Sequence, residues 1–335
     1  MTDRAPTIRD VAARAGVSKS LVSLVLQGGR NVGTQRREAV EAAIAELGYR
    51  PNLNAQNLSQ THTRTIGVLL NDLRNPWYVD LVEEAVGVLH EHGLSPLLAD
   101  SHLTRKSGRD PAEIFLGQRI EGMLVIGTAA DEDVVRRIAA EVPTVLAGTT
   151  EPHLPHVDSV SNDDELGERL ATEHLLSLGH RDIALLLGPG AVGRSRRAGY
   201  EAAMASAGLT SLVRTAAYDM TEQGGSVAAA SLFASGPRPT AIVAFNDVGA
   251  VGALTAVEEA GLSVPEDVSL IGYDDTSLAR LRHLSLTSVD NRNAEVGRIA
   301  AEELVTRMLE PDLPARSNSV VPILRVRATT AAPRG

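Results

Sequence analysis

The sequence predicts an all-α head followed by an α/β domain of two doubly wound lobes. Two observations lead to this fold class. Residues 7–48 hold three short helical patterns separated by glycines, and from Thr65 onwards short apolar runs alternate with amphipathic stretches. Such alternation is typical of parallel sheets covered by helices on both faces. A chain of 335 residues is long enough for a head and one or two further domains.

The head is expected to hold a helix, a tight turn and a second helix. Thr7 and Asp10 fit a capping box at the start of the first helix, and Gly16 fits its end. Ser18 can cap the second helix, which we expect to extend to about Leu26. Such helix-turn-helix patterns also arise by chance, so an ordinary helical bundle remains the alternative for this pattern alone.

A third helix is expected between Thr34 and Leu47, with Gly48 as its C-terminal stop. Its spacing of apolar residues predicts one face in the core of the head. The core positions expected on this helix are Ala39, Val40, Ile44 and Leu47.

Charge differs between the head and the rest of the chain. Residues 1–64 contain nine Lys or Arg and five Asp or Glu, a formal charge of +4. Residues 65–335 contain 23 basic and 37 acidic residues, a formal charge of −14. A basic head on an acidic body is the pattern expected when the head contacts DNA phosphates.

Composition excludes several classes of protein. The chain has no cysteine, which excludes structural disulfides, thiolate zinc sites and a cysteine nucleophile. No apolar run reaches the roughly 20 residues that a membrane helix needs, and the first ten residues lack the apolar core of a signal peptide. We therefore expect a cytoplasmic protein without a membrane partner.

The body is expected to form two sheets, because it has too many strands for one modest sheet. The expected strands are residues 66–70, 95–100, 122–127, 144–148, 182–188, 241–246 and 268–274. The expected helices between them include Tyr78–His92, Glu165–Leu178, Ala198–Ala207 and Ala250–Ala260. Ligands of such folds bind beyond the carboxyl ends of the strands. Polar residues at these ends, which predict a cleft between the lobes, are Asn71, Asp100, Thr128, Asn246 and Asp274.

Several motifs, in this order, resemble the LacI/GalR family of bacterial transcriptional regulators. They are TIRDVAARAGVSKSLVSLVLQG, GYRPNLNAQNLS, TRTIGVLLNDLRNPWY, ATEHLLSLGHRDIALLLGP and VPEDVSLIGYDDT. The likeness covers essentially the whole chain. It implies a helix-turn-helix domain at 1–50, a hinge at 51–63 and an effector-binding and dimerisation domain at 64–335, similar to periplasmic sugar-binding proteins. The implied N-lobe is about 64–162 and 293–322, and the C-lobe about 163–292 and 323–335.

The resemblance implies a repressor whose affinity for a palindromic operator is controlled by a small ligand in the cleft. A sugar or glycoside is favoured, with a nucleoside as the alternative; whether the ligand induces or corepresses is left open. The protein is expected to be a homodimer without cofactor or metal. The implied DNA contacts are Thr7, Ser18, Lys19, Ser20, Ser23, Leu24, Thr34, Asn52, Ala55 and Leu58. Of these, Leu58 matches the leucine that wedges into the minor groove at the operator centre. The alternative is that Leu58 is an ordinary leucine of a linker.

Leu24 departs from the family, which usually has an arginine at this position. An arginine can hydrogen-bond a guanine edge in bidentate fashion, whereas a leucine can only touch a thymine methyl. We therefore expect an operator altered at that base step. The alternative is that Leu24 packs inside the head.

The effector contacts implied by the resemblance are Trp77, Tyr78, Arg196, Asn246 and Asp274. Aromatic rings stack on the C–H faces of sugars, and a guanidinium grips hydroxyls or a carboxylate through its planar fork. Each position also has a structural interpretation. Trp77 fits a core residue, Asp274 a solvated or capping carboxylate, and Arg196 a solvated basic turn.

Two other classes of protein fit parts of the sequence. Residues 188–193, GPGAVG, fit the dinucleotide fingerprint G-x-G-x-x-G, which would favour an NAD-dependent enzyme. That motif requires a helix that begins at its glycines and an acidic residue about 20 residues further on. We expect the basic residues 194–197 to follow the glycines instead, and the next strand end, near Asp219, is too distant. A solute-binding protein for transport shares the body but lacks a DNA-binding head. His174 and His180 are expected to be structural.

Overall fold

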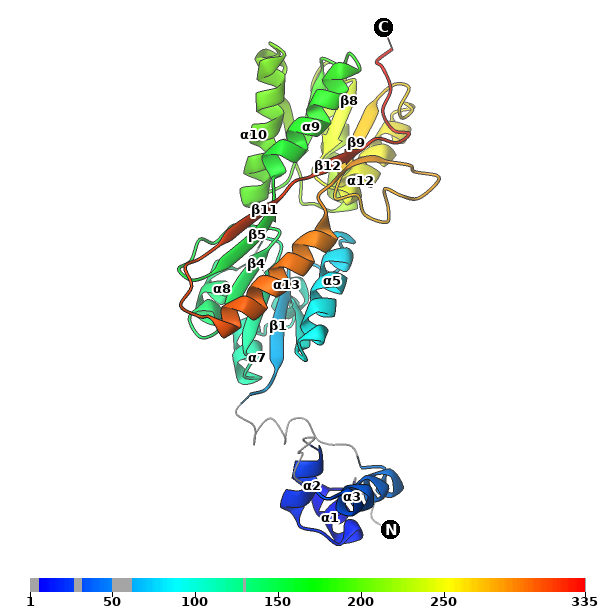
Figure 1. The fold of residues 1–335 in the computed structure, drawn as a ribbon. Helices are drawn as coiled ribbons and strands as arrows, with labels where there is room; N and C mark the ends of the chain where they lie inside the picture. The colour runs from blue at the N-terminus through cyan, green and yellow to red at the C-terminus, as the bar shows by residue number, and fades with distance from the viewer. Residues whose placement is uncertain (1–5, 27–31, 50–61, 129–130, 335) are drawn as a thin grey trace. The chain divides into compact units, whose positions relative to one another are not determined.

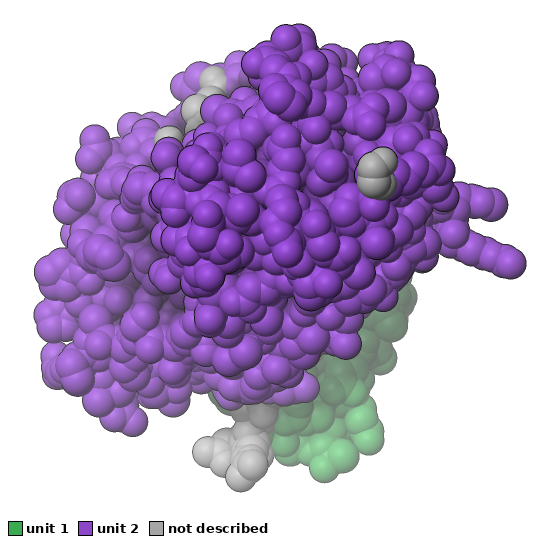
Figure 2. All heavy atoms as spheres, turned by 90° about the horizontal axis from the view of Figure 1, so that it is seen from above, with its two compact units in different colours: residues 1–63 green, residues 64–335 purple. Residues whose placement is uncertain are grey.

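The chain forms two units, residues 1–63 and residues 64–335 (Figures 1 and 2). The structure is a computed structural model that describes residues 6–26, 32–49, 62–128 and 131–334. The first unit is helical, and the second holds two six-stranded sheets with helices. The fold class expected from the sequence is therefore confirmed. In the described ranges no helix is long and apolar enough to cross a membrane.

The head is built from three helices, α1 (Ile8–Ala15), α2 (Lys19–Leu26) and α3 (Thr34–Leu47). The capping box of α1 is confirmed, because the amide and hydroxyl of Thr7 donate to the Asp10 carboxylate at 2.7 and 2.6 Å. At the start of α2 the Leu21 amide donates to the Ser18 hydroxyl oxygen at 3.2 Å. Gly16 ends α1 and Gly48 ends α3 in the left-handed conformation, which glycine adopts without steric cost.

The core of the head differs from the prediction at one position. On α3 Ala39 is exposed and Ala43 is buried. Val40, Ala43, Ile44 and Leu47 lie at helical spacing, whereas Ala39 lies about 100° from Val40, just beyond the edge of that face. The buried residues of the head core are Val11, Ala12, Val22, Val25, Val32, Val40 and Ala43.

The second unit consists of two lobes, each with one sheet. The N-lobe sheet is parallel throughout, in the order β11-β5-β4-β3-β1-β2. Its strands are β1 (Thr65–Leu70), β2 (Ser95–Asp100), β3 (Gly122–Ile126), β4 (Thr144–Ala147), β5 (Asp158–Asn162) and β11 (Ser317–Val320). The C-lobe sheet has the order β12-β10-β9-β8-β6-β7, with only β12 antiparallel. Its strands are β6 (Ile183–Leu187), β7 (Arg214–Ala217), β8 (Ala241–Ala244), β9 (Ser269–Tyr273), β10 (Thr287–Asp290) and β12 (Ile323–Arg325).

Helices cover both faces of each sheet, and each face has its own apolar core. The N-lobe helices are α5 (Trp77–Glu91), α6 (Ser101–Lys106), α7 (Pro111–Gly117), α8 (Glu132–Ala139) and α13 (Asn293–Leu309). The C-lobe helices are α9 (Asp164–Ser177), α10 (Gly190–Ser206), α11 (Glu222–Ala234) and α12 (Asp247–Glu259), with a 3-10 turn at Thr210–Leu212. The chain passes between the lobes from β5 to α9, from β10 to α13 and from β11 to β12 (Figure 1).

Helix α10 corrects an expectation about its start. It begins at Gly190, not near Ala198, so residues 194–197 lie within a helix. A Cβ on Gly193 would lie 2.0 Å from the Gly188 carbonyl oxygen, and one on Gly199 would lie 2.1 Å from the Glu165 carbonyl oxygen. Close packing therefore requires glycines, whose low helix propensity concealed this part of the helix.

His180 is structural, as expected. Its Nδ1 lies 2.9 Å from the Thr240 hydroxyl, and its Nε2 lies 2.8 Å from the Ala331 carbonyl oxygen. The nearby His174 Nε2 lies 3.1 Å from the Thr330 hydroxyl. The two imidazoles thus hold the C-terminal segment against the C-lobe.

Candidate functional site

A cleft with a volume of about 340 Å³ lies between the two lobes of the second unit. Loops after β1, β3 and β4 line it from the N-lobe, and the start of α10 and loops after β7, β8 and β9 line it from the C-lobe. The structure brings together in this cleft all five residues that the sequence singled out for a ligand. They are Trp77, Tyr78, Arg196, Asn246 and Asp274.

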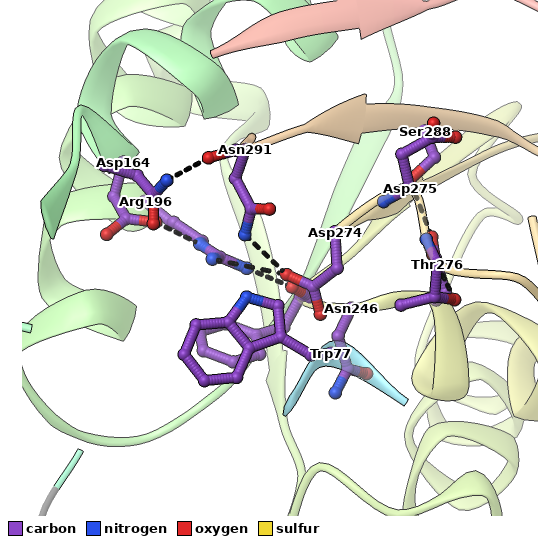
Figure 3. A network of polar contacts seen from close by, with 12 residues as sticks. Trp77, Asp164, Arg196, Asn246, Asp274, Asp275, Thr276, Ser288 and Asn291 are labelled. Carbon is purple, nitrogen blue, oxygen red and sulfur yellow. Dashed lines mark hydrogen bonds and ion pairs between the residues drawn. The ribbon is translucent and has the colours of Figure 1, made fainter. Parts of the chain in front are cut away.

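Arg196 is buried at the C-lobe side of the cleft. Its Nε donates to Asp164 Oδ1 at 2.9 Å, its Nη1 donates to the Phe245 carbonyl oxygen, and its Nη2 lies 4.0 Å from Asp274 Oδ1 (Figure 3). The guanidinium carbon lies 3.4 Å from the centroid of the Tyr273 ring, within cation–π range. Burial alone lowers the pKa of Arg196, but the neighbouring carboxylates raise it, so the side chain stays charged. The interpretation as a solvated turn is therefore wrong for Arg196.

Asn246 caps α12 and leaves part of its side chain unpaired. Its Oδ1 accepts from the Gly249 amide and from the Tyr218 hydroxyl, each at 2.8 Å. Its Nδ2 is buried and has no hydrogen-bond partner among the described residues. A buried donor without a partner costs free energy, so a ligand oxygen in the cleft would stabilise it.

Asp274 and Asn291 form a second polar contact in the cleft. Asp274 is buried, with φ +100°, and its Oδ1 accepts from Asn291 Nδ2 at 3.0 Å (Figure 3). Burial raises the pKa of Asp274, and Arg196 opposes that shift. The interpretation of Asp274 as a solvated carboxylate is therefore wrong. Asn291 Oδ1 is a buried acceptor with no partner within the described ranges.

Asn291 also joins the cleft to the crossovers between the lobes. It lies between β10 and α13, and its carbonyl oxygen accepts from Nδ2 of Asn162, which ends β5 at another crossover. A shift of Asn291 would therefore act on two of the three connections between the lobes.

Trp77 forms a wall of the cleft at the start of α5. Its ring lies edge-on to the Tyr78 ring, with centroids 4.8 Å apart and an interplanar angle of 82°. A Cβ on Gly148, where φ is +76°, would lie 2.6 Å from the indole Cη2; one on Gly127 would lie 2.8 Å from the Tyr78 hydroxyl oxygen. Trp77 is 9% exposed, lines the cleft and also packs in the N-lobe core. It is therefore both a cleft residue and a core residue, the two positions that the sequence left open.

Several lining residues were not predicted from the sequence, and one expectation was wrong. Asn162 ends β5, Asp164 follows it and Asn291 follows β10; the polar sequences of these strands, DSVSN and TSVD, give no apolar run. Asp100 was expected at the cleft but does not line it. Its carboxylate accepts from the amides of Leu73 and Leu103 at 2.8 and 2.9 Å, so it holds two loops together.

The head presents an exposed side of α2. Lys19, Ser20 and Leu24 are exposed on it, and Ser23 is half-buried. Leu24 keeps 38% of its surface exposed, so it does not pack inside the head. A short side chain at Ser20 or Ser23 and a long one at Lys19 are compatible with a helix lying in the major groove.

Comparison with known proteins decides the family. The model "Bacterial regulatory proteins, lacI family" matches residues 7–52, and the model "Periplasmic binding protein-like domain" matches residues 172–330. The ribose operon repressor of Escherichia coli K12 is 34% identical over 332 residues, covering 96% of this chain and 99% of its own. The chain belongs to the lacI family. A further relative, the HTH-type transcriptional repressor PurR of Edwardsiella ictaluri, is 30% identical and covers 97% of both chains.

This lacI-family protein also resembles solved structures along its length. The lac repressor dimer bound to operator and the anti-inducer ONPF has a TM-score of 0.84 and 29% identity, with coverage of 98% of this chain and all of that one. The present chain is therefore a DNA-binding transcriptional repressor. Its relatives are repressors, not enzymes, which excludes the dinucleotide-dependent enzyme.

The glycine motif at residues 188–193 differs from the expectation in one respect. We expected no helix at Gly188 to Gly193, but α10 begins at Gly190. Gly193 serves close packing against the Gly188 carbonyl oxygen. A helix after glycines is thus insufficient evidence for a dinucleotide site.

The remaining positions implied for DNA contact lie at helix starts or outside the described residues. Thr7 and Ser18 precede α1 and α2, and Thr34 is exposed at the first position of α3. The hinge residues lie outside the described ranges. They are Asn52, Ala55 and Leu58.

Proposed function

We propose that this repressor binds a palindromic operator as a homodimer and that a sugar or glycoside in the cleft controls its operator affinity. The observation that carries the proposal is one cleft lined by both lobes: Arg196, Asn246 and Asp274 come from the C-lobe, Asn71 and Trp77 come from the N-lobe, and Asn291 lies at a crossover. A ligand that contacts both lobes binds one lobe arrangement better than another and shifts the population towards it. We propose that this change in lobe arrangement acts on the hinge and thereby changes operator affinity.

Base recognition is assigned to the exposed side of α2. Lys19 and Ser20 would contact base edges, and Ser23 would face the DNA beside Leu24. Leu24 would contact a thymine methyl, because a leucine has no donor for guanine. The two heads of a homodimer would read two half-sites related by symmetry, which is why the operator is expected to be a palindrome.

Phosphate contacts are assigned to Thr7, Ser18 and Thr34. Helix starts carry unpaired amides and the positive end of the helix dipole, and both favour phosphate oxygens. In the hinge, Asn52 and Ala55 would lie along the minor groove, and Leu58 would enter a base step at the operator centre. The hinge assignments rest on the family resemblance.

The ligand contacts are assigned by chemistry. The Trp77 face, with Tyr78 beside it, would pack on the C–H face of a sugar ring. The Asn246 amide would donate to a ligand hydroxyl, and Asp274 would accept from one. Arg196, fixed by Asp164, would supply a preorganised charged donor.

The test is selection of DNA from a random library by the full-length protein, without additives and with pooled sugars or pooled nucleosides. We expect recovery of a short palindrome whose retention changes with the sugar pool. A response to the nucleoside pool alone would replace sugar by nucleoside as the ligand. Absence of sequence preference in every condition would refute the assigned base contacts.

A further inference from the structure

The charged groups of the cleft are already matched to one another. Two arginines line it, Arg74 and Arg196, and no lysine lies among the described lining residues. Arg74 Nε donates to both Asp72 carboxylate oxygens, at 2.8 and 3.1 Å. Arg196 is held by Asp164 as described above, with Asp274 4.0 Å away. Each guanidinium therefore has its own carboxylate.

The cleft also holds a carboxylate that no lining cation matches. Asp219 Oδ1 accepts from the Thr221 amide at 3.1 Å and from its hydroxyl at 2.6 Å. These hydrogen bonds lower the pKa of Asp219, so the group is ionised at neutral pH. Asp219 is exposed and therefore adds negative potential at the side of the cleft formed by the loop after β7.

Among the described residues that line the cleft, the buried side-chain atoms without a hydrogen-bond partner are neutral. Asn246 Nδ2 is a buried donor and Asn291 Oδ1 a buried acceptor, and both residues line the cleft. Carboxamides of this kind match hydroxyl groups, which donate and accept. A phosphate group, with a charge of about −1.5 to −2 and three acceptor oxygens, needs cations or several donors instead.

We propose that the cleft selects an uncharged, hydroxyl-bearing ligand and rejects the phosphate ester of the same compound. This inference rests on the proposed function, since it names the ligand class of the same cleft. Both guanidinium groups are paired with carboxylates, so Arg196 can donate to a hydroxyl while its charge is already balanced by Asp164. Asp219 repels an anion, and the unmatched atoms of Asn246 and Asn291 suit hydroxyls. Dehydration of a phosphate among these groups would have no compensating ion pair.

The first test uses matched pairs of compounds with the intact protein at pH 8. The pairs are ribose and ribose 5-phosphate, glucose and glucose 6-phosphate, and adenosine and its 5′-monophosphate, measured by calorimetry and thermal shift. The neutral member of a binding pair should bind at least tenfold more tightly than its ester. An ester that binds as tightly as its parent would overturn the proposal.

Asp219→Asn tests the contribution of the unmatched carboxylate. It should reduce the preference for the neutral member by about two- to threefold. The matched control is Asp312→Asn, which removes the same charge from an exposed turn outside the cleft lining and should leave the preference unchanged. Equal effects of the two substitutions would show that net charge, and not the cleft, sets the preference.

A second test needs no ligand, because Trp77 is the only tryptophan of the chain and lines the cleft. Relative to a free tryptophan derivative, caesium should quench the fluorescence of Trp77 more strongly than iodide does. Asp219→Asn should reduce this difference between the two ions, and Asp312→Asn should leave it unchanged. Equal quenching, or stronger quenching by iodide, would contradict the charge argument. If the proposed function alone were wrong, no compound would bind, but caesium would still quench Trp77 more strongly than iodide.

Discussion

Replacing Arg196 by methionine should destabilise the second unit strongly. The substitution keeps an unbranched side chain but removes the partner of Asp164 and the donor to the Phe245 carbonyl oxygen. Breaking a buried ion pair by removing one partner costs about 3–5 kcal/mol, because the remaining charge is left uncompensated. Arg196 and Asp164 are both buried, at 4% and 8% exposure, so solvent screens little of this cost.

The pH dependence of this variant has a defined sign. Burial already raises the pKa of Asp164, and Arg196 opposes the shift. Without Arg196 the folded-state pKa rises further above the unfolded value, so the folded state binds more protons than the unfolded state does. Its free energy of unfolding then falls as pH rises through the folded pKa. Glu168 lies one turn further along α9 and is fully buried, and burial raises its pKa to about 8. It therefore also makes the free energy of unfolding fall as pH rises.

Urea unfolding followed by circular dichroism at pH 5 and pH 7.5 measures both effects. We expect Arg196→Met to lose about 3–5 kcal/mol at pH 7.5 and less at pH 5. The control is Arg197→Met on the same helix, where an exposed pair with Glu201 contributes about 0.3–0.5 kcal/mol. A loss below about 1 kcal/mol for Arg196→Met, or a larger loss at pH 5, would refute the reasoning.

Three further substitutions test the cleft and the head. Gly148→Ala forces an alanine to φ +76° against the indole, so we expect a loss of about 2–4 kcal/mol in urea unfolding and a shifted Trp77 emission; an unchanged spectrum would contradict the packing described here. Arg194→Gln breaks an exposed interlobe pair with Glu151, 2.8 Å long, and should change ligand affinity no more than about fivefold by calorimetry; a larger effect would mean that the pair governs lobe closure. Leu24→Arg should move the selected operator towards guanine at one base step, worth about 1–3 kcal/mol; an unchanged consensus would remove Leu24 from base contact.

Local chemistry made the head predictable from the sequence. Capping depends on contacts within a few residues, so it can be recognised in the sequence. The structure confirms the predicted caps at both ends of α1, at the start of α2 and at the end of α3: Thr7 with Asp10, Gly16, Ser18 and Gly48. The apolar runs of the central strands were equally visible. Burial on both faces makes such strands continuous in hydrophobic residues, which a sequence pattern detects.

Long-range packing concealed the rest of the fold and part of the cleft. The first turns of α10 are rich in glycine because other backbone atoms approach them closely, which no local pattern indicates. Asn246 and Asp274 follow apolar strands and could be placed at the cleft, whereas Asp164 and Asn291 follow strands with polar sequences and could not. Asp100 follows a strand but turns to loop amides, so a polar strand end alone does not define a lining residue.

The central claim is that cleft and operator are coupled, and a reciprocal binding measurement tests it most directly. Operator affinity would be measured by fluorescence anisotropy with and without the neutral compound that binds, and affinity for that compound by calorimetry with and without operator. The account predicts that both affinities change by the same factor, about 5–150-fold for a typical coupling of 1–3 kcal/mol. Operator affinity that stays constant at saturating ligand would contradict the account.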